Sequence, residues 1–458
     1  MSVAIAVFTR DLRVHDNPVL HAACRGATEV VPLFVLDSGI RTSGFLSPNR
    51  AAFLAEALSD LDAALRYRGG RLVVRSGAVV TEVARIVAEL DATEVHLAAD
   101  ASGYSHHRER ALRARLDGQG CRLHVHANTI TVVEPAAITP SGGGDHFAVF
   151  TPYHRRWLTT AARNLVPVPQ RVAVPPITSD PLPTPEDICP GRRSPRLAPG
   201  GETAGRRVLD AWLDGPIQDY EQAHDDLAGD ATSRLSPYLH FGCVSPTEAI
   251  RRADSSTTGG EAFIRQMAWR DFHHQVLAAR PDTPATDYRT RHDQWRQDES
   301  AAHAWRDGRT GYPIVDAGMR QLAEEGWMHN RARLLTASFL TKTLYLDWRL
   351  GARHFLDLLV DADVANNQLN WQWAAGTGTD SRPNRVLNPL RQAGRYDPHG
   401  DYVRRYLPEL RDVEGAAVHE PWKLDPRDRA RLDYPDPIID LRDGAEYFHT
   451  ARGKNSGG

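Results

Sequence analysis

The stretch DADVANNQLNWQW, residues 361–373, contains more hydrogen-bonding side chains than an ordinary amphipathic helix. If it forms a helix, Asp363, Asn367 and Trp371 are spaced four residues apart and share one face. That face offers a carboxylate that accepts, an amide that donates or accepts, and an aromatic plane. A polar heterocycle with ring nitrogens and carbonyls would use all three groups. The alternative is a buried polar network between helices.

Two more predicted helices place amides, arginines and indoles at helical spacing. The sets that share a face are Gln266, Trp269 and Arg270 in RQMAWRDFHH, and Asn330, Arg333 and Leu334 in GWMHNRARLL. Arg331 falls on a neighbouring face. Amides beside an indole suit recognition of a nucleobase edge together with stacking on its face. For each stretch alone, the alternative is a buried core in which these polar side chains have hydrogen-bond partners within the protein.

Hydroxyl groups gather at the start of another predicted helix, in TSRLSPYLHFG (232–242). Thr232, Ser233 and Ser236 supply them. Pro237 fits the first turn of the helix, and Arg234 adds a positive charge. A helix start with free N–H groups, hydroxyls and an arginine favours a phosphate or diphosphate site. Ordinary helix capping is the alternative.

The first part of the chain has the pattern of an α/β domain. Helical patterns over residues 1–127 alternate with short apolar runs at 3–8, 30–36, 71–75, 94–98 and 122–126. This alternation predicts a doubly wound parallel sheet. No GxGxxG follows the first run, so a dinucleotide fingerprint is missing there.

The remainder is divided by a change in proline content. Residues 128–200 hold thirteen of the thirty prolines and predict an interdomain linker with one helix near 150–165. Residues 201–447 predict an all-α domain, followed by a short tail at 448–458. Ser245 and Glu248 predict a capping box within the all-α domain. Nine of the ten tryptophans lie after residue 200.

Composition narrows the class of protein. The net charge is −3, so any nucleic-acid contact has to be a local basic patch. Four scattered cysteines form no CxxC pair, which argues against a zinc site or a disulfide framework and favours a reducing compartment. No apolar run approaches the length of a membrane span, and the N-terminus predicts a strand. We expect a cytoplasmic monomer without metal.

Taken together, six segments resemble the photolyase/cryptochrome superfamily over nearly the whole chain, and most of all its bacterial cyclobutane pyrimidine dimer photolyases. The segments are TRDLRVHDNPVL (9–20), TSRLSPYLHFG, WRDFHH, GRTGYPIVDAGMRQLAEEGWMHNR, DADVANNQLNWQWAAGTGTD and RRYLPEL (404–410). The resemblance implies an α/β N-terminal domain and an all-α C-terminal domain that binds FAD.

The resemblance also implies roles around the flavin. Residues 232–236, which include Leu235, would hold the FAD diphosphate with Tyr220 nearby. The isoalloxazine and sugar would be surrounded by Arg270, Arg333, Asp361, Asp363 and Asn367. Asn367 would face flavin N5, where an amide suits more than one flavin protonation state. Because cryptochromes often carry another residue there, Asn367 favours a repair enzyme.

The tryptophans receive separate roles from the same resemblance. Trp371, Trp348 and Trp295 match a relay that carries electrons from the surface to photoexcited oxidised flavin. Trp269 and Trp373 match the pair lining the cavity in which a flipped lesion rests. The other tryptophans are expected to pack in the core or the linker.

The implied reaction is light-driven splitting of cyclobutane pyrimidine dimers in UV-damaged DNA by electron transfer from reduced FAD. Arg331 is the expected phosphate contact, and Arg382 and Arg385 are weaker candidates. Asn330 and Leu334 stand where six-four photolyases have histidines, which argues against that lesion. Gln266 stands where cyclobutane-dimer photolyases commonly have a glutamate.

Two further expectations concern the antenna and the alternative function. Relatives with a folate antenna usually have Asn-Glu at the positions where this chain has Tyr104 and Ser105. The resemblance therefore also allows a deazaflavin antenna, or none. The rival reading is a cryptochrome-like blue-light photoreceptor with the same FAD and relay. Such receptors often carry a long extension, so the short tail favours repair.

Overall fold

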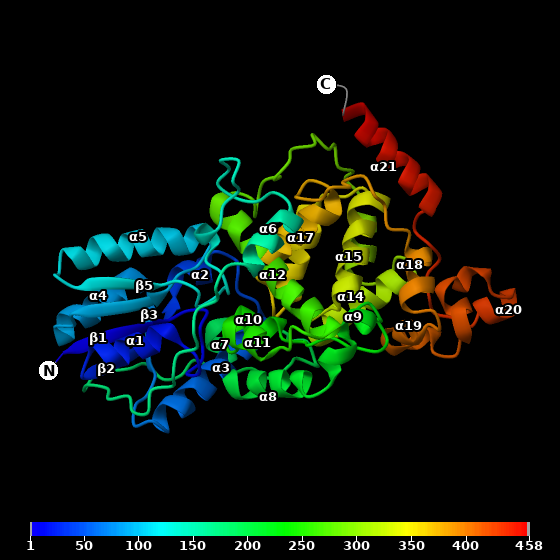
Figure 1. Ribbon diagram of the computed structural model, residues 1–458. Helices are drawn as coiled ribbons and strands as arrows, with labels where there is room; N and C mark the ends of the chain where they lie inside the picture. Colours follow the sequence, from blue (N-terminus) through cyan, green and yellow to red (C-terminus); the bar gives the residue numbers. More distant parts are fainter. Residues whose placement is uncertain (1, 456–458) are drawn as a thin grey trace.

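The computed structural model describes residues 2–455 and shows a five-stranded sheet beside a larger helical body (Figure 1). The sheet has the order β3-β2-β1-β4-β5, and every pairing is parallel. Its strands are β1 (Val3–Phe8), β2 (Glu29–Asp37), β3 (Val73–Gly77), β4 (Glu94–Ala98) and β5 (Arg122–His126). The predicted α/β domain is confirmed.

One strand begins later than its apolar run predicted. β3 starts at Val73, although the run started at residue 71. The backbone N–H of Leu72 donates to the Asp62 carboxylate at 2.8 Å, so it is not available to a neighbouring strand. A side chain from the preceding helix therefore shortens β3.

Helices cover both faces of the sheet, as the complete burial of β1 requires. Ala4, Ala6 and Phe8 share a core with α1 (Pro18–Gly26) and α3 (Pro48–Arg66). Val3, Ile5 and Val7 share another with α4 (Val79–Leu90) and α5 (Gly103–Asp117). A short helix, α2 (Ser38–Thr42), follows β2.

The linker runs back along the sheet domain before it enters the helical body. The N–H of Val172 donates to the carbonyl of Arg68, and the N–H of Asp180 donates to that of Val74. The predicted helix is present as α6 (Phe150–Leu158), and a short α7 (Pro185–Ile188) follows. These backbone hydrogen bonds attach an irregular, proline-rich segment to the domain surface.

The remainder of the described chain is helical and contains no β-strand, as predicted. A π-helical turn, Phe339–Thr343, follows α15. The α-helices are α8 (Glu202–Leu213), α9 (Tyr220–Ala223), α10 (Ser236–His240), α11 (Pro246–Arg252), α12 (Thr258–Ala279), α13 (Glu299–Arg306), α14 (Pro313–Glu325), α15 (Asn330–Ser338), α16 (Trp348–Leu358), α17 (Val364–Ala375), α18 (Pro389–Tyr396), α19 (Asp401–Tyr406), α20 (Pro426–Arg429) and α21 (Leu441–Asn455). None of the helices within residues 2–455 is long and apolar enough to cross a membrane.

The boundary predicted at 447/448 is wrong. Helix α21 continues across it, and Phe448 is fully buried. The Arg452 guanidinium pairs with the Asp293 carboxylate at 2.6 and 2.7 Å. A buried aromatic and a buried ion pair therefore hold this segment on the helical body. Residues 456–458 of the predicted tail lie outside the described residues.

The capping box predicted at α11 is only half formed. Ser245 accepts a hydrogen bond from the N–H of Glu248, as a cap should. The Glu248 carboxylate, however, pairs with Arg206 at 2.7 and 2.9 Å. An ion pair to another helix has replaced the reciprocal cap contact.

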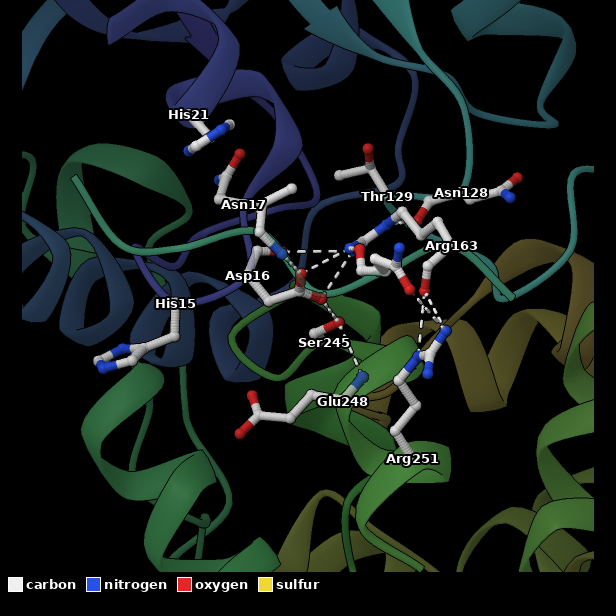
Figure 2. A network of polar contacts seen from close by, with 12 residues as sticks. His15, Asp16, Asn17, His21, Asn128, Thr129, Arg163, Ser245, Glu248 and Arg251 are labelled. Atoms are coloured by element: carbon white, nitrogen blue, oxygen red, sulfur yellow. Dashed lines mark hydrogen bonds and ion pairs between the residues drawn. The ribbon is translucent and has the colours of Figure 1, made fainter. Parts of the chain in front are cut away.

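A buried carboxylate, Asp16, joins three distant segments at the domain junction (Figure 2). Arg163 of the linker donates to both of its oxygens at 2.5 and 2.6 Å. Ser245, the cap of α11, and the N–H of Val166 donate to it as well. Burial alone would raise the pKa of Asp16, but the hydrogen bonds from Arg163 and Ser245 outweigh it and hold that pKa below its usual value.

Asp16→Asn should lower the free energy of unfolding at pH 7 by about 1–3 kcal/mol, because a buried charge-assisted contact is lost. Asparagine tolerates the left-handed backbone of this residue (φ 48°). Since the folded pKa is depressed, the contribution of Asp16 is complete above the unfolded pKa of about 3.9 and disappears as the pH falls through the folded pKa. Urea unfolding at several pH values measures this difference.

The exposed Asp117 at the end of α5 supplies the control. Asp117→Asn should leave the free energy of unfolding nearly unchanged at every pH. A difference between wild type and Asp16→Asn that did not narrow below about pH 4 would contradict the assigned role.

Candidate functional site

A cavity of about 460 Å³ lies in the helical body between α12, α15 and α17. The three stretches singled out by helical spacing converge on it. The predicted site residues that line it are Tyr220, Ser233, Ser236, Gln266, Trp269, Arg270, Asn330, Arg331, Arg333, Leu334, Asp361, Asp363, Asn367, Trp371 and Trp373. Thr232, Arg234, Leu235, Trp295 and Trp348 do not belong to its lining.

Arg234 is not available as a free charge for a phosphate. Its guanidinium pairs with Asp230 at 2.7 Å and with Glu325 at 2.8 Å, and it stacks on the Trp327 ring at 4.2 Å. Two carboxylates thus neutralise the charge that the sequence suggested for a diphosphate. Leu235 is a core residue. The hydroxyl-bearing Ser233 and Ser236 do face the cavity.

Asp363 precedes helix α17, so the prediction that it lies within the helix is wrong. The helix begins at Val364, and Asp363 caps it by accepting from the N–H of Asn366 at 2.9 Å. The other carboxylate oxygen pairs with Arg10 and lies 3.3 Å from His274 Nε2. Burial alone would raise the pKa of Asp363, but His274 and Arg10 hold it well below its usual value.

Asp361 presents an unused acceptor to the cavity. One oxygen accepts from Arg333 at 2.8 Å, while Oδ1 is buried without a hydrogen-bond partner among the described residues. The buried Thr232 hydroxyl also lacks a partner there. Because an orphaned buried polar atom is costly, the free oxygen of Asp361 fits a molecule that is bound in the cavity and donates a hydrogen bond.

The Asn367 side chain is oriented by its neighbours. Its amide nitrogen donates to the Ala352 carbonyl at 3.2 Å and to Gln368 Oε1 at 3.0 Å. The carbonyl oxygen is therefore the group left for a ligand, and it accepts. An N–H group of a bound heterocycle would match it.

The two predicted cavity tryptophans are supported differently. Trp269 stacks on Phe150 of α6, with ring centroids 3.7 Å apart and planes 6° apart. Trp373 carries the Arg385 guanidinium 5.5 Å from its ring. A linker aromatic therefore stiffens one wall, and a cation from the segment after α17 covers the other.

Arg331 reaches the cavity rim with its charge already paired. It donates to both oxygens of Asp225 at 2.6 Å and stacks 4.4 Å from the Tyr396 ring. A phosphate at this position would compete with Asp225. Arg385, whose side chain lies on Trp373, is therefore a stronger phosphate candidate than the sequence indicated.

The three tryptophans predicted to form an electron relay differ in burial and in their contacts. Trp371 packs edge-to-face on Phe355 and against Gly351 of α16. Trp348 begins the same helix, is fully buried, and donates to Asp287 at 2.9 Å. Trp295 is half-buried, 5.0 Å from the Tyr345 ring. Of the three, Trp371 alone lines the cavity, and Trp295 is the most exposed.

Several contributors were missed by the sequence analysis. Arg10, Phe150, Asp225 and His274 support the cavity walls through the contacts described above. Phe150 comes from the linker and Arg10 from the sheet domain, so no local spacing connects them to the helices they contact. His274 was within the quoted stretch WRDFHH, and its position four residues after Arg270 was the one usable signal.

An α/β sheet domain docked on a helical domain with this polar and aromatic cavity defines the two-domain class of the photolyases and cryptochromes. The family model "DNA photolyase" matches residues 4–175, and "FAD binding domain of DNA photolyase" matches residues 263–453. A Streptomyces griseus deoxyribodipyrimidine photo-lyase is 61% identical over 455 residues, covering 99% of this chain and 100% of the relative.

Solved structures agree with these matches. A class III photolyase from Agrobacterium tumefaciens superposes with a TM-score of 0.92 at 32% identity, covering 99% of this chain and 98% of that one. A Synechocystis cryptochrome superposes with a TM-score of 0.90 at 29% identity, covering 98% and 99%. The chain belongs to the DNA photolyase family, as the resemblance implied, and its helical domain is an FAD-binding domain.

Gly351→Ala should destabilise the protein by about 1–3 kcal/mol, because overpacking forces neighbours out of place. The added Cβ would lie 2.1 Å from the Trp371 ring and 2.6 Å from Leu340. Thermal unfolding of the FAD-loaded protein measures the effect. Gly394→Ala in α18, whose Cβ would meet nothing within 4 Å, is the control and should stabilise by about 0.4–1 kcal/mol. Equal changes in the thermal stability of the two variants would contradict the close packing of Gly351 against Trp371.

Proposed function

We propose that the protein repairs cyclobutane pyrimidine dimers in UV-damaged DNA by a light-driven electron transfer. The observation that carries the proposal is one cavity that combines an amide and carboxylate edge with two indole walls. The first set suits a flavin, and the second suits a pair of unstacked bases. The 61% identity to a deoxyribodipyrimidine photo-lyase supports this reading over the photoreceptor alternative.

Bound FAD, in its reduced form, would supply the electron that opens the dimer when light is absorbed. The chain's own residues would bind and orient the cofactor. Asp361 and Arg333 form a hydrogen-bonded pair at the cavity edge, and the spare oxygen of Asp361 can accept from a ring N–H. Asn367 offers its carbonyl oxygen as an acceptor, which suits a reduced flavin that carries a hydrogen on N5.

The opposite side of the cavity would receive the lesion. A damaged pair is weakly stacked, so it costs less to flip out of the duplex than an intact pair. Trp269, stiffened by Phe150, and Trp373 would provide faces for the extruded bases. Asn330 and Leu334 line this cavity, and neither supplies the imidazole that six-four photolyases have at these positions, which favours cyclobutane over six-four lesions. Gln266 would meet a pyrimidine edge as a neutral donor and acceptor.

The remaining expectations extend the same proposal. We infer a monomer that acts on DNA in the cytoplasm. The two residues at the predicted antenna position make polar contacts within the sheet domain. Tyr104 bonds to Asp37, and the Ser105 hydroxyl donates to Asp100 at 3.1 Å. Both side chains are held within the sheet domain.

The decisive experiment illuminates the FAD-loaded, chemically reduced protein with single-stranded DNA that contains one thymine dimer. Restored thymines, detected by chromatography, should accumulate over many turnovers in blue light and not in darkness. A matched oligonucleotide with a six-four lesion should remain unrepaired. Absence of turnover with both lesions would overturn the repair proposal and leave the photoreceptor reading.

Trp371→Phe should nearly abolish photoreduction of oxidised FAD and leave repair by pre-reduced enzyme close to wild type. The reason is that Trp371 alone of the three relay tryptophans lines the cavity, so electrons from Trp348 and Trp295 would pass through it. Flavin absorbance under illumination measures the first property, and dimer repair measures the second.

Trp305→Phe supplies the matched control for the relay. Trp305 touches Trp371 edge-to-face at 5.9 Å but is buried to 1% exposure and does not line the cavity. Photoreduction should persist in this variant. Loss of repair in pre-reduced Trp371→Phe would show that Trp371 serves binding or stability instead of electron supply.

A further inference from the structure

Four potential metal ligands lie on one face of the sheet, at its β5 edge. Glu94 and His96 are two residues apart on β4, and His124 and His126 are two residues apart on β5. The strand register places His96 opposite His124. Because side chains alternate along a strand, all four point to the same side. The His96 ring stacks on those of His124 and His126, with centroids 4.8 and 5.2 Å apart.

The ligand atoms of Glu94, His96 and His124 lie within 4.8 Å of one another. His96 Nε2 is 3.4 Å from one Glu94 oxygen, and His124 Nε2 is 3.7 Å from the other. Tetrahedral zinc with bonds of about 2.0–2.1 Å separates its ligands by roughly 3.3 Å. Small side-chain rotations would therefore bring these atoms into the coordination sphere of one ion.

The imidazole nitrogens facing Glu94 lack other partners. His96 is buried to 4% exposure, and its Nε2 and that of His124 are buried atoms without a hydrogen-bond partner in the described part of the chain. The other nitrogen of His96, Nδ1, lies 3.0 Å from His126 Nε2. If His96 donates there, its Nε2 carries a free lone pair. Metal-binding histidines usually donate their second nitrogen in this way.

The surroundings also admit a cation. Gly26, at the end of α1, makes room for the carboxylate, since a Cβ there would lie 2.8 Å from Glu94 Oε2. The C-terminal end of a helix carries partial negative charge. Arg122 opposes a cation because it donates to Glu94 Oε1 at 2.6 Å. Its side chain is 73% exposed, and such surface ion pairs are weak and easily exchanged.

We propose that Glu94, His96 and His124 form a zinc site on the sheet domain, with His126 orienting His96. Two imidazoles and one carboxylate match the ligands that Zn²⁺ prefers and leave a fourth position for water or another ligand. The cysteines, on which the sequence analysis based its expectation of no metal, take no part. None of the four residues lines the flavin cavity, so the site is separate from the proposed repair function. Bound zinc would join the edge strand β5 to β4.

The test uses the untagged, FAD-loaded full chain, stripped with a chelator and titrated with zinc chloride. Calorimetry should show one zinc per chain, and the melting temperature should rise with zinc concentration, because an ion that binds the folded state stabilises it. His124→Gln, at a half-buried edge position, should abolish both effects. His126→Phe should weaken zinc binding by about 10- to 100-fold, as loss of an outer partner does.

His107→Gln is the matched control, since His107 is exposed on α5 in the same domain. It should bind zinc as the wild type does. Absence of stoichiometric binding to the wild-type chain would overturn the proposal. So would unchanged binding by His124→Gln, or an equal loss in His107→Gln. Light-driven repair, assayed in parallel, should be similar in all three variants, so failure of one proposal is distinguishable from failure of the other.

Discussion

The contact between Arg10 and Asp363 joins the two domains at the point where the cavity is built. Arg10 follows β1 and also pairs with Asp100, which follows β4. The strand order reverses between β1 and β4, and the crevice at such a reversal is where open α/β sheets bind ligands. Here the crevice holds the carboxylate that caps α17. The helix that carries Asn367, Trp371 and Trp373 is therefore positioned by the sheet domain.

The buried carboxylates near the site differ in how completely they are paired. A buried carboxylate that lost its partner would be strongly destabilising, so Asp363 and Asp16 hold their surroundings in one arrangement. Asp363 is satisfied by Arg10, His274 and the start of α17. Asp361 differs, since it keeps one oxygen without a partner beside the cavity. Two carboxylates two residues apart therefore differ, because Asp363 is paired whereas Asp361 can still accept a hydrogen bond.

Local pattern was enough for most of the architecture. Short apolar runs placed four of the five strands closely, and helical spacing brought Gln266, Trp269 and Arg270 to one wall of the cavity. The errors arose where a distant group competed. Asp62 accepts the hydrogen bond from the N–H of Leu72, so β3 begins later. Arg206 pairs with the Glu248 carboxylate, which therefore does not complete the capping box. Glu325 pairs with Arg234 and neutralises its charge. None of these partners is recognisable from spacing.

The sequence by itself determined the two-domain plan, the family resemblance and the residue types that line the cavity, because periodicity and short motifs are local properties of the chain. Tertiary structure alone decided which polar groups remain free. It paired Arg331 with Asp225, bound the Asn367 amide nitrogen to the Ala352 carbonyl, set Phe150 behind Trp269 and gathered two histidines beside Glu94. Those contacts join residues that are far apart in the chain, so they exist only once the protein has folded.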